Sequence, residues 1–281
     1  GVQTCALPIS VIDWIRTDLM YPWSDGTFSL YFDKTRFAYF DCMILKREDA
    51  KEDYSKEEMD KVYQLDKIIT EHEKEQLIDT IIVKTQGFIN GNIKDGDKNP
   101  VAIFKTLLAS YNGIDQKALR ENLEYFLERI MPVCDEYGIN MCIHPDDPPY
   151  PVLGLPRIVS NREDIEWILN AVNNPHNGIT FCAGSLSSGI HNNVPELARQ
   201  FASRTRFVHL RSTNILSDGN FIEAPHLEGR GHLIELARIF EKENPLLPMR
   251  VDHGRLMLDD ADKGYNPGYS FYRSEERRVG K

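Results

Sequence analysis

Four short apolar runs in this chain each end on a side chain of a type that commonly binds metal ions. His144 follows residues 139–143, Cys182 follows 179–181, His209 follows 207–208 and Asp252 follows 249–251. The four side chains are separated by 38, 27 and 43 residues, and each interval is long enough for a strand, a helix and two loops. The spacing therefore predicts four neighbouring parallel strands with these side chains at one end, where β/α barrels hold catalytic metals.

The sequence changes character near residue 138, from mostly helical segments to alternating strands and helices. Helices are predicted at residues 56–85, 115–137, 164–172, 196–202 and 232–243. Gly138 ends the second of them, and Ser160 with Glu163 forms a capping-box pattern before the third. The predicted fold class is α/β, a TIM (β/α)8 barrel.

Both ends of the chain differ from the rest. Residues 1–9 and 274–281 show no usable periodicity and resemble translated sequencing-adapter sequence, so we exclude them from the domain. We expect a single partial barrel domain over 10–273, with a mostly helical region at 10–138 and β/α repeats carrying the metal site at 139–273. A complete barrel needs eight strands, typically in about 250 residues, and only four strands are evident.

Composition excludes several classes of partner. The formal charge of −10 has no long single-sign block, which argues against nucleic-acid binding. No apolar run approaches the roughly 18 residues of a membrane span, so we expect no membrane association. The five cysteines form no CxxC pair, as is typical of a reducing compartment, and the predicted location is the cytoplasm.

Six segments carry distinctive strings: VIDWIRTDL (11–19), HPDDPPYPVLGLPRIVS (144–160), FCAGSLSSG (181–189), FVHLRST (207–213), MRVDHGRLMLDD (249–260) and NPGYS (266–270). Together they resemble the mannonate dehydratase family of hexuronate degradation, over nearly all of residues 11–271. The resemblance implies a TIM barrel, Mn²⁺ or Fe²⁺, and the conversion of D-mannonate to 2-keto-3-deoxy-D-gluconate in glucuronate catabolism. It also implies a chain truncated at both ends that supplies strands five to eight, with a helical N-terminal insert.

The four candidate ligands, His144, Cys182, His209 and Asp252, form a mixed set that suits Fe²⁺, Mn²⁺ or Zn²⁺. The resemblance favours manganese. Cys182 also has a structural interpretation, because buried cysteine is often only a small hydrophobe.

Dehydration of a sugar acid removes a proton next to a carboxylate, which requires a cation to stabilise the developing negative charge. The leaving hydroxyl also needs a proton donor across the substrate from the base. His253 and Tyr269 are our candidates for base and acid, in either order. His191 and His226 lie in predicted loops, where we expect surface residues.

Four further side chains have both a functional and a structural interpretation. Arg211 and Arg157 are candidates to bind the substrate carboxylate in bidentate geometry, and the alternative is a solvated charge. Asp146 either contacts substrate or, with Asp147, shapes a proline-stiffened turn. Arg16 either contacts substrate or forms a cap or salt bridge.

The expected function is that of a metal-dependent hydro-lyase, a mannonate dehydratase, acting on the small-molecule sugar acid D-mannonate; homo-oligomerisation is left open. One alternative is a divalent-metal sugar isomerase or epimerase of the xylose-isomerase-like barrels. The other is an inactive metal-binding fragment. An isolated half-barrel has unpaired strand edges, so we expect this chain alone to be inactive.

Overall fold

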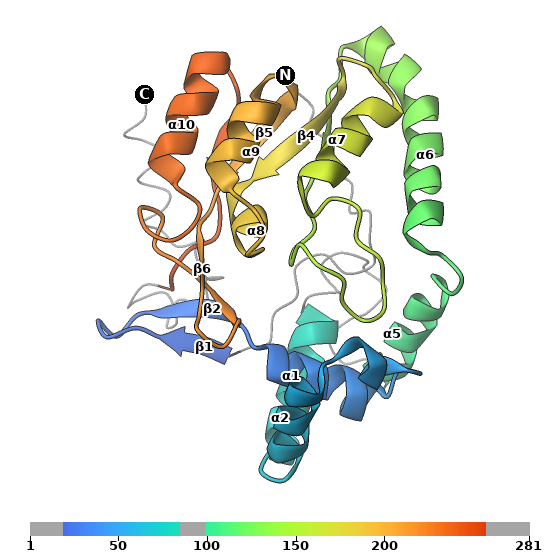
Figure 1. Ribbon diagram of the computed structural model, residues 1–281, viewed down its shortest axis with the longest axis vertical. Helices are drawn as coiled ribbons and strands as arrows, with labels where there is room; N and C mark the ends of the chain where they lie inside the picture. Colours follow the sequence, from blue (N-terminus) through green and yellow to red (C-terminus); the bar gives the residue numbers. More distant parts are fainter. Residues whose placement is uncertain (1–18, 85–98, 257–281) are drawn as a thin grey trace.

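The computed structural model describes residues 19–84 and 99–256, which form two four-stranded sheets and the helices around them (Figure 1). Tyr269, Arg16 and the adapter-like segments 1–9 and 274–281 lie outside the described residues. The strands are β1 (Leu19–Pro22), β2 (Phe28–Phe32), β3 (Met141–Ile143), β4 (Asn177–Cys182), β5 (Thr205–Leu210), β6 (Thr213–Ile215), β7 (Phe221–Glu223) and β8 (Met249–Val251).

The α-helices are α1 (Lys34–Tyr39), α2 (Lys56–Asp66), α3 (Glu71–Ile78), α5 (Pro100–Ala109), α6 (Gln116–Tyr137), α7 (Arg162–Ala171), α8 (Ala183–Ser187), α9 (Val194–Phe201) and α10 (Leu233–Glu243). Shorter segments are the π-helices η1 (Phe40–Leu45) and η3 (Asp79–Lys84) and the 3-10 helices η2 (Ala50–Asp53) and η4 (Ala202–Arg204).

The parallel sheet has the order β3-β4-β5-β8, so the prediction of four neighbouring parallel strands is confirmed. Cys182 at the end of β4 pairs in register with His209 on β5. Within the described residues the sheet is open, with β3 and β8 at its edges. These residues therefore establish a mixed α/β fold with a parallel sheet.

Side-chain alternation along the parallel strands separates the core from the candidate ligands. Ile179, Phe181 and Val208 pack with residues of α7, α8, α9 and α10 in one hydrophobic cluster. Successive side chains on a strand point to opposite faces, so Cys182 and His209 project from the face that the helices leave uncovered. The pleat thus sends the apolar residues to the core and the ligands away from it.

Helix α6 follows the predicted limits closely. The Asp115 side chain caps its first turn by accepting from the Ala118 amide at 2.8 Å. Gly138 ends it in the left-handed region at φ 64°, which glycine adopts without steric cost. Leu123 and Leu127 on one side of α6 join a buried cluster that covers the outer edge of the sheet next to β3.

Two predicted helices differ from the structure, one in its continuity and one in its N-terminal cap. The segment 56–85 divides into α2, α3 and η3, because Thr70 and Glu73 form a capping box that begins a second helix. Helix α7 is capped by Asn161, which accepts from the Asp164 amide at 2.9 Å, and not by a box of Ser160 with Glu163.

The second sheet was not predicted. It is antiparallel, has the order β1-β2-β7-β6, and joins the start of the described chain to the segment after β5. Gly219, at φ 81°, forms the turn between β6 and β7, strands of three residues that are too short for a clear alternating pattern. The sheet brings Glu223, at the end of β7, toward the parallel sheet.

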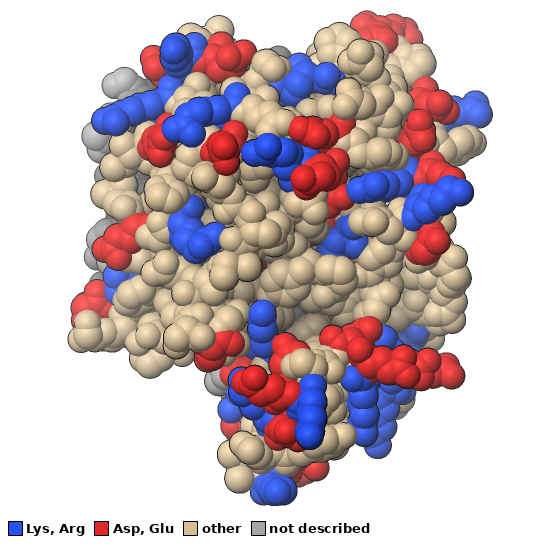
Figure 2. Space-filling view, viewed as in Figure 1, with Lys and Arg blue, Asp and Glu red and all other residues tan. Residues whose placement is uncertain are grey.

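Charges of both signs intermix on the face seen in Figure 2, without a large region of one sign. Exposed ion pairs such as Arg199–Glu235, between α9 and α10, contribute little stability. None of the helices within residues 19–84 and 99–256 combines the length and apolar composition needed to cross a bilayer. The surface charges therefore do not identify a binding partner.

Helix α10 offers a matched test of the core. Leu236 is 0% exposed in the cluster beneath α10, whereas Ile234 on the same helix is 54% exposed. Leu236→Ala should lower the free energy of unfolding by about 2 to 5 kcal/mol, because it removes buried methyl groups and leaves a cavity. Ile234→Ala should change it by less than about 1 kcal/mol. Urea unfolding monitored by circular dichroism measures both, and equal losses would contradict this packing.

Candidate metal centre

Three candidate ligands converge at one end of the parallel sheet. His144, Cys182 and His209 each offer one ligand atom, and these atoms all lie within 4.8 Å of one another. His144 Nε2 is 3.3 Å from His209 Nδ1, and Cys182 is fully buried. Two imidazoles and a sulfur from three adjacent strands can bind a divalent transition metal, so the donor set fits such an ion.

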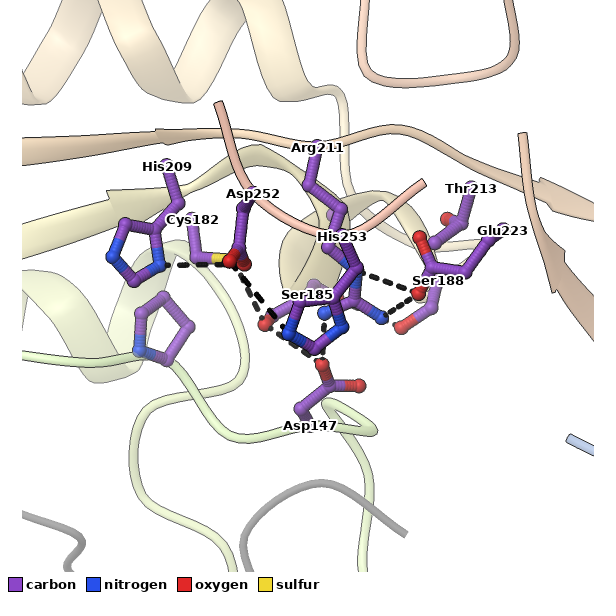
Figure 3. A network of polar contacts seen from close by, with 12 residues as sticks. Asp147, Cys182, Ser185, Ser188, His209, Arg211, Thr213, Glu223, Asp252 and His253 are labelled. Atoms are coloured by element: carbon purple, nitrogen blue, oxygen red, sulfur yellow. Dashed lines mark hydrogen bonds and ion pairs between the residues drawn. The ribbon is translucent and has the colours of Figure 1, made fainter. Parts of the chain in front are cut away.

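Asp252 follows β8 and lies beside this group without belonging to it. Its Oδ2 atom is 3.7 Å from His209 Nδ1, and its Oδ1 atom accepts from Arg250 Nη2 at 3.3 Å. The structure thus places all four predicted side chains at the same end of the sheet, with three in one group and the carboxylate next to it. Figure 3 shows Cys182, His209 and Asp252 of this set.

The two imidazoles change the acidity of Cys182. Burial raises the pKa of its thiol, but the charge and hydrogen bonding of His144 and His209 outweigh burial and bring the pKa well below its ordinary value. The thiolate is the form of cysteine that binds metal ions.

A buried network of ion pairs lies behind the cluster. Arg211, just after β5, is 2% exposed, and its guanidinium lies between two carboxylates. Its Nη1 atom pairs with Asp147 Oδ2, and its Nη2 and Nε atoms donate to Glu223 Oε1 at 2.6 and 2.7 Å (Figure 3). The interpretation of Arg211 as a solvated charge is therefore wrong. Its contacts hold the segments that carry Asp147 and Glu223 together.

Ser185 connects this network to the candidate ligands. Its Oγ atom lies 3.1 Å from Asp147 Oδ2 and 3.1 Å from Cys182 Sγ. Gly184 allows the arrangement, because a Cβ atom at this position would overlap the Cγ and Cδ atoms of Arg211. The first turn of α8 therefore fits between the cysteine and the arginine.

Arg157 and Asp146, two further candidate residues, lie together between β3 and α7. Asp146 Oδ2 accepts from the amides of Ile158 and Val159 at 3.1 and 2.8 Å, and from Ser160 Oγ at 3.1 Å. Arg157 Nη1 lies 3.4 Å from Asp146 Oδ1, and both side chains are buried. These contacts favour the turn-shaping interpretation of Asp146, and they show that Arg157 is not a solvated charge.

His253 lies next to Asp252, with its Nε2 atom 3.6 Å from Asp252 Oδ1, and does not belong to the group of three ligands. Tyr269 and Arg16 fall outside the described residues. His226, which we expected at the surface, is partly buried, and its Nε2 atom is 3.3 Å from the Asp252 carbonyl oxygen.

Sequence reasoning missed three members of the network. Asp147 was expected only to shape a turn, although its place three residues after His144 was a usable signal. Ser185 follows Cys182 by three residues, a spacing that brings side chains together once α8 begins there. Glu223 had no signal, because it comes from the unpredicted antiparallel sheet.

A cavity of about 1000 Å³ lies elsewhere, between the helical region and the loop that contains Tyr150. Among the predicted site residues that the structure describes, none lines it. We therefore assign the chemistry to the ligand cluster and not to this cavity.

Comparison with known proteins adds an independent observation. The family described as D-mannonate dehydratase (UxuA) matches residues 1–277. Mannonate dehydratases from Marinomonas sp. (strain MWYL1) and Chromohalobacter salexigens are 40% and 39% identical, over 96% and 92% of this chain and 70% and 67% of theirs. The crystal structure of mannonate dehydratase from Streptococcus suis serotype 2 superposes with a TM-score of 0.65 at 28% identity, over 96% of this chain and 66% of that one. The chain thus spans about two thirds of the length of these relatives.

Gly184→Ala tests the close packing of α8 against Arg211. The added methyl group meets the middle of a side chain that two carboxylates hold, so the guanidinium has to leave its position. We expect a loss of about 3 kcal/mol or more in the free energy of unfolding, as when a buried ion pair is broken. Gly113→Ala is the control, because a Cβ atom at this position would contact no other atom. This variant should lose only about 1 to 2 kcal/mol of unfolding free energy, since alanine is strained in the left-handed backbone conformation of Gly113. Thermal and urea unfolding should show that Gly184→Ala is less stable than Gly113→Ala. The reverse order would contradict the packing of α8 against Arg211.

Glu223 gives a pH-dependent prediction. Burial raises its pKa to about 7 although Arg211 opposes the rise, and Asp147 and Asp252 add to it. The unfolded chain releases this proton near the ordinary pKa of 4.5. Between these two values the folded state binds more protons, so stability falls as pH rises, and the loss is complete above about pH 7.

Glu223→Gln keeps an oxygen for Arg211 and removes the charge. It should flatten the decline in unfolding free energy between about pH 5 and pH 8, by an amount on the order of 1 to 3 kcal/mol. The control Glu241→Gln, at an exposed position on α10, should keep the parental decline. Urea titrations at both pH values measure the difference, and a Glu223→Gln variant with the parental slope would refute the assignment.

Proposed function

The chain belongs to the D-mannonate dehydratase family, and we propose that it carries the metal site that dehydrates D-mannonate to 2-keto-3-deoxy-D-gluconate. The observation that supports this most directly is the convergence of His144, Cys182 and His209 at adjacent strand ends. Such a cluster can bind a divalent cation, and removal of a proton next to a carboxylate requires a cation to stabilise the negative charge that develops.

We further propose that the parallel sheet is part of a (β/α)8 barrel. Helices α7, α9 and α10 pack on one face of the sheet, and the candidate ligands lie on the other, at or after the carboxyl ends of β3, β4, β5 and β8. Catalytic residues occupy this end of the strands in barrel enzymes.

His144, Cys182, His209 and Asp252 would hold the ion, either Mn²⁺ or Fe²⁺. Asp252 already contacts His209, so a small side-chain movement would add its carboxylate to the three converging donors. A divalent cation in this position would stabilise the negative charge that develops beside the substrate carboxylate when a proton leaves. The carboxylate suits harder ions, whereas the thiolate suits softer ones.

His253 is the proposed proton-transfer residue. Its backbone position directly follows Asp252, and its imidazole lies beside that carboxylate without joining the ligand cluster. In the proposed reaction one group accepts the proton from the carbon next to the carboxylate. A second group protonates the hydroxyl that leaves the next carbon as water, and the enol product becomes the ketone. His253 and Tyr269 take these two roles.

We propose structural roles for three residues that were candidates for substrate binding: Arg211, Arg157 and Asp146. The buried contacts of Arg211 and of the Arg157–Asp146 pair support roles in holding the loops around the site. Binding of the substrate carboxylate by these side chains, and by Arg16, stays a prediction. A reducing compartment such as the cytoplasm stays a prediction from the sequence. Homo-oligomerisation also stays a prediction.

A sugar isomerase or epimerase is the alternative within enzymes, and product chemistry separates the two. Dehydration of D-mannonate yields a 2-keto-3-deoxy acid that reacts with thiobarbiturate, whereas isomerisation yields no such product. An isomerised sugar acid without thiobarbiturate colour would favour the alternative.

In a complete version of this enzyme, His253→Asn should separate catalysis from metal binding. Loss of an acid or base typically lowers the rate by about 10² to 10⁴, while the cluster keeps its ion. Cys182→Ser is the matched variant that should lose metal as well as rate. Metal content by elemental analysis and product formation from D-mannonate with Mn²⁺ measure the two effects. A His253→Asn variant with more than about a tenth of the parental kcat would exclude His253 as the proton-transfer group.

A further inference from the structure

We propose that Ser185 is a positioning residue that donates a hydrogen bond to the Cys182 sulfur and thereby sets which divalent ion the site prefers. This inference rests on the proposed function in one respect, that Cys182 is a metal ligand. It adds a determinant of metal preference that lies outside the ligand set.

The geometry favours sulfur as the acceptor of the Ser185 proton. Ser185 Oγ is 3.1 Å from both Cys182 Sγ and Asp147 Oδ2. Hydrogen bonds between two oxygens are usually about 2.7 to 2.8 Å long, so 3.1 Å is long for Asp147. The same distance is a close contact for sulfur, which has the larger radius. A hydroxyl has a single proton to donate.

Charge favours the same direction. Asp147 Oδ2 already receives a charge-assisted hydrogen bond from Arg211, which partly satisfies this oxygen (Figure 3). The Cys182 side chain is fully buried, and its sulfur lies within 4.8 Å of the ligand atoms of His144 and His209. Because Arg211 already donates to this Asp147 oxygen, the single Ser185 hydroxyl hydrogen is available for the sulfur.

A hydrogen bond to a thiolate withdraws electron density from the sulfur and weakens it as a donor. Softer ions such as Zn²⁺ gain most from a strong sulfur donor, whereas Mn²⁺ relies more on imidazole and carboxylate ligands. Ser185 should therefore reduce the advantage of Zn²⁺ over Mn²⁺ at this site. Contacts of this kind change metal affinity by about 10- to 100-fold.

The test uses the full 281-residue chain and Co²⁺, whose thiolate complexes absorb light by charge transfer from sulfur. Ser185→Ala should move this absorption band to longer wavelength, because a sulfur without its hydrogen bond gives up charge more easily. The matched control is Ser188→Ala on the following turn, whose hydroxyl donates to the Ser185 carbonyl oxygen at 2.8 Å and not to the Cys182 sulfur. This control should keep the parental band.

Competition between Zn²⁺ and Mn²⁺ gives the second measurement. Ser185→Ala should raise the Zn²⁺ preference by about tenfold, and Ser188→Ala should leave it unchanged. An unshifted band and an unchanged metal ratio in a folded Ser185→Ala variant would overturn the inference. Cys182→Ser distinguishes this failure from failure of the proposed site. If the band survives in that variant, Cys182 is not a ligand and both proposals fall.

Discussion

One buried guanidinium organises the region around the candidate site. Arg211 lies between Asp147, from the loop after β3, and Glu223, from the antiparallel sheet. Taking these charges out of water costs several kcal/mol for each ion, and only their mutual contacts offset that cost. The three segments are therefore bound to one arrangement, because displacing any of them leaves a buried charge without its partner. Through Glu223, the antiparallel sheet becomes part of the support of the site.

The same contacts lead outward from Arg211 to the ligand cluster. Asp147 contacts Ser185, Ser185 contacts Cys182, and Gly184 leaves the space in which the arginine passes α8. Ligand geometry must be held closely for catalysis, since a displacement of about 1 Å can cost on the order of 10² in rate. The parallel sheet sets the approximate position of each ligand, and the buried polar network limits the remaining movement.

The sequence predicted the parts of this protein that follow from regular periodicity. The apolar runs before His144, Cys182, His209 and Asp252 gave the four parallel strands, and the caps of α6 gave its limits. It did not predict β6 and β7, because three-residue strands carry no period and the pairing of β7 with β2 is a tertiary contact. The environment of Arg211 was hidden for the same reason. Its partners lie 64 and 12 residues away along the chain, and only the folded arrangement shows that they enclose it.

The burial of Cys182 has a chemical consequence of another kind. A cysteine with a lowered pKa is normally prone to oxidation by peroxide, through a sulfenic acid to irreversible products. Here Cys182 is 0% exposed, so an oxidant reaches its sulfur only when the protein opens locally. The lifetime of the thiolate in air is then governed by how often the protein opens locally, and less by the intrinsic reactivity of the sulfur.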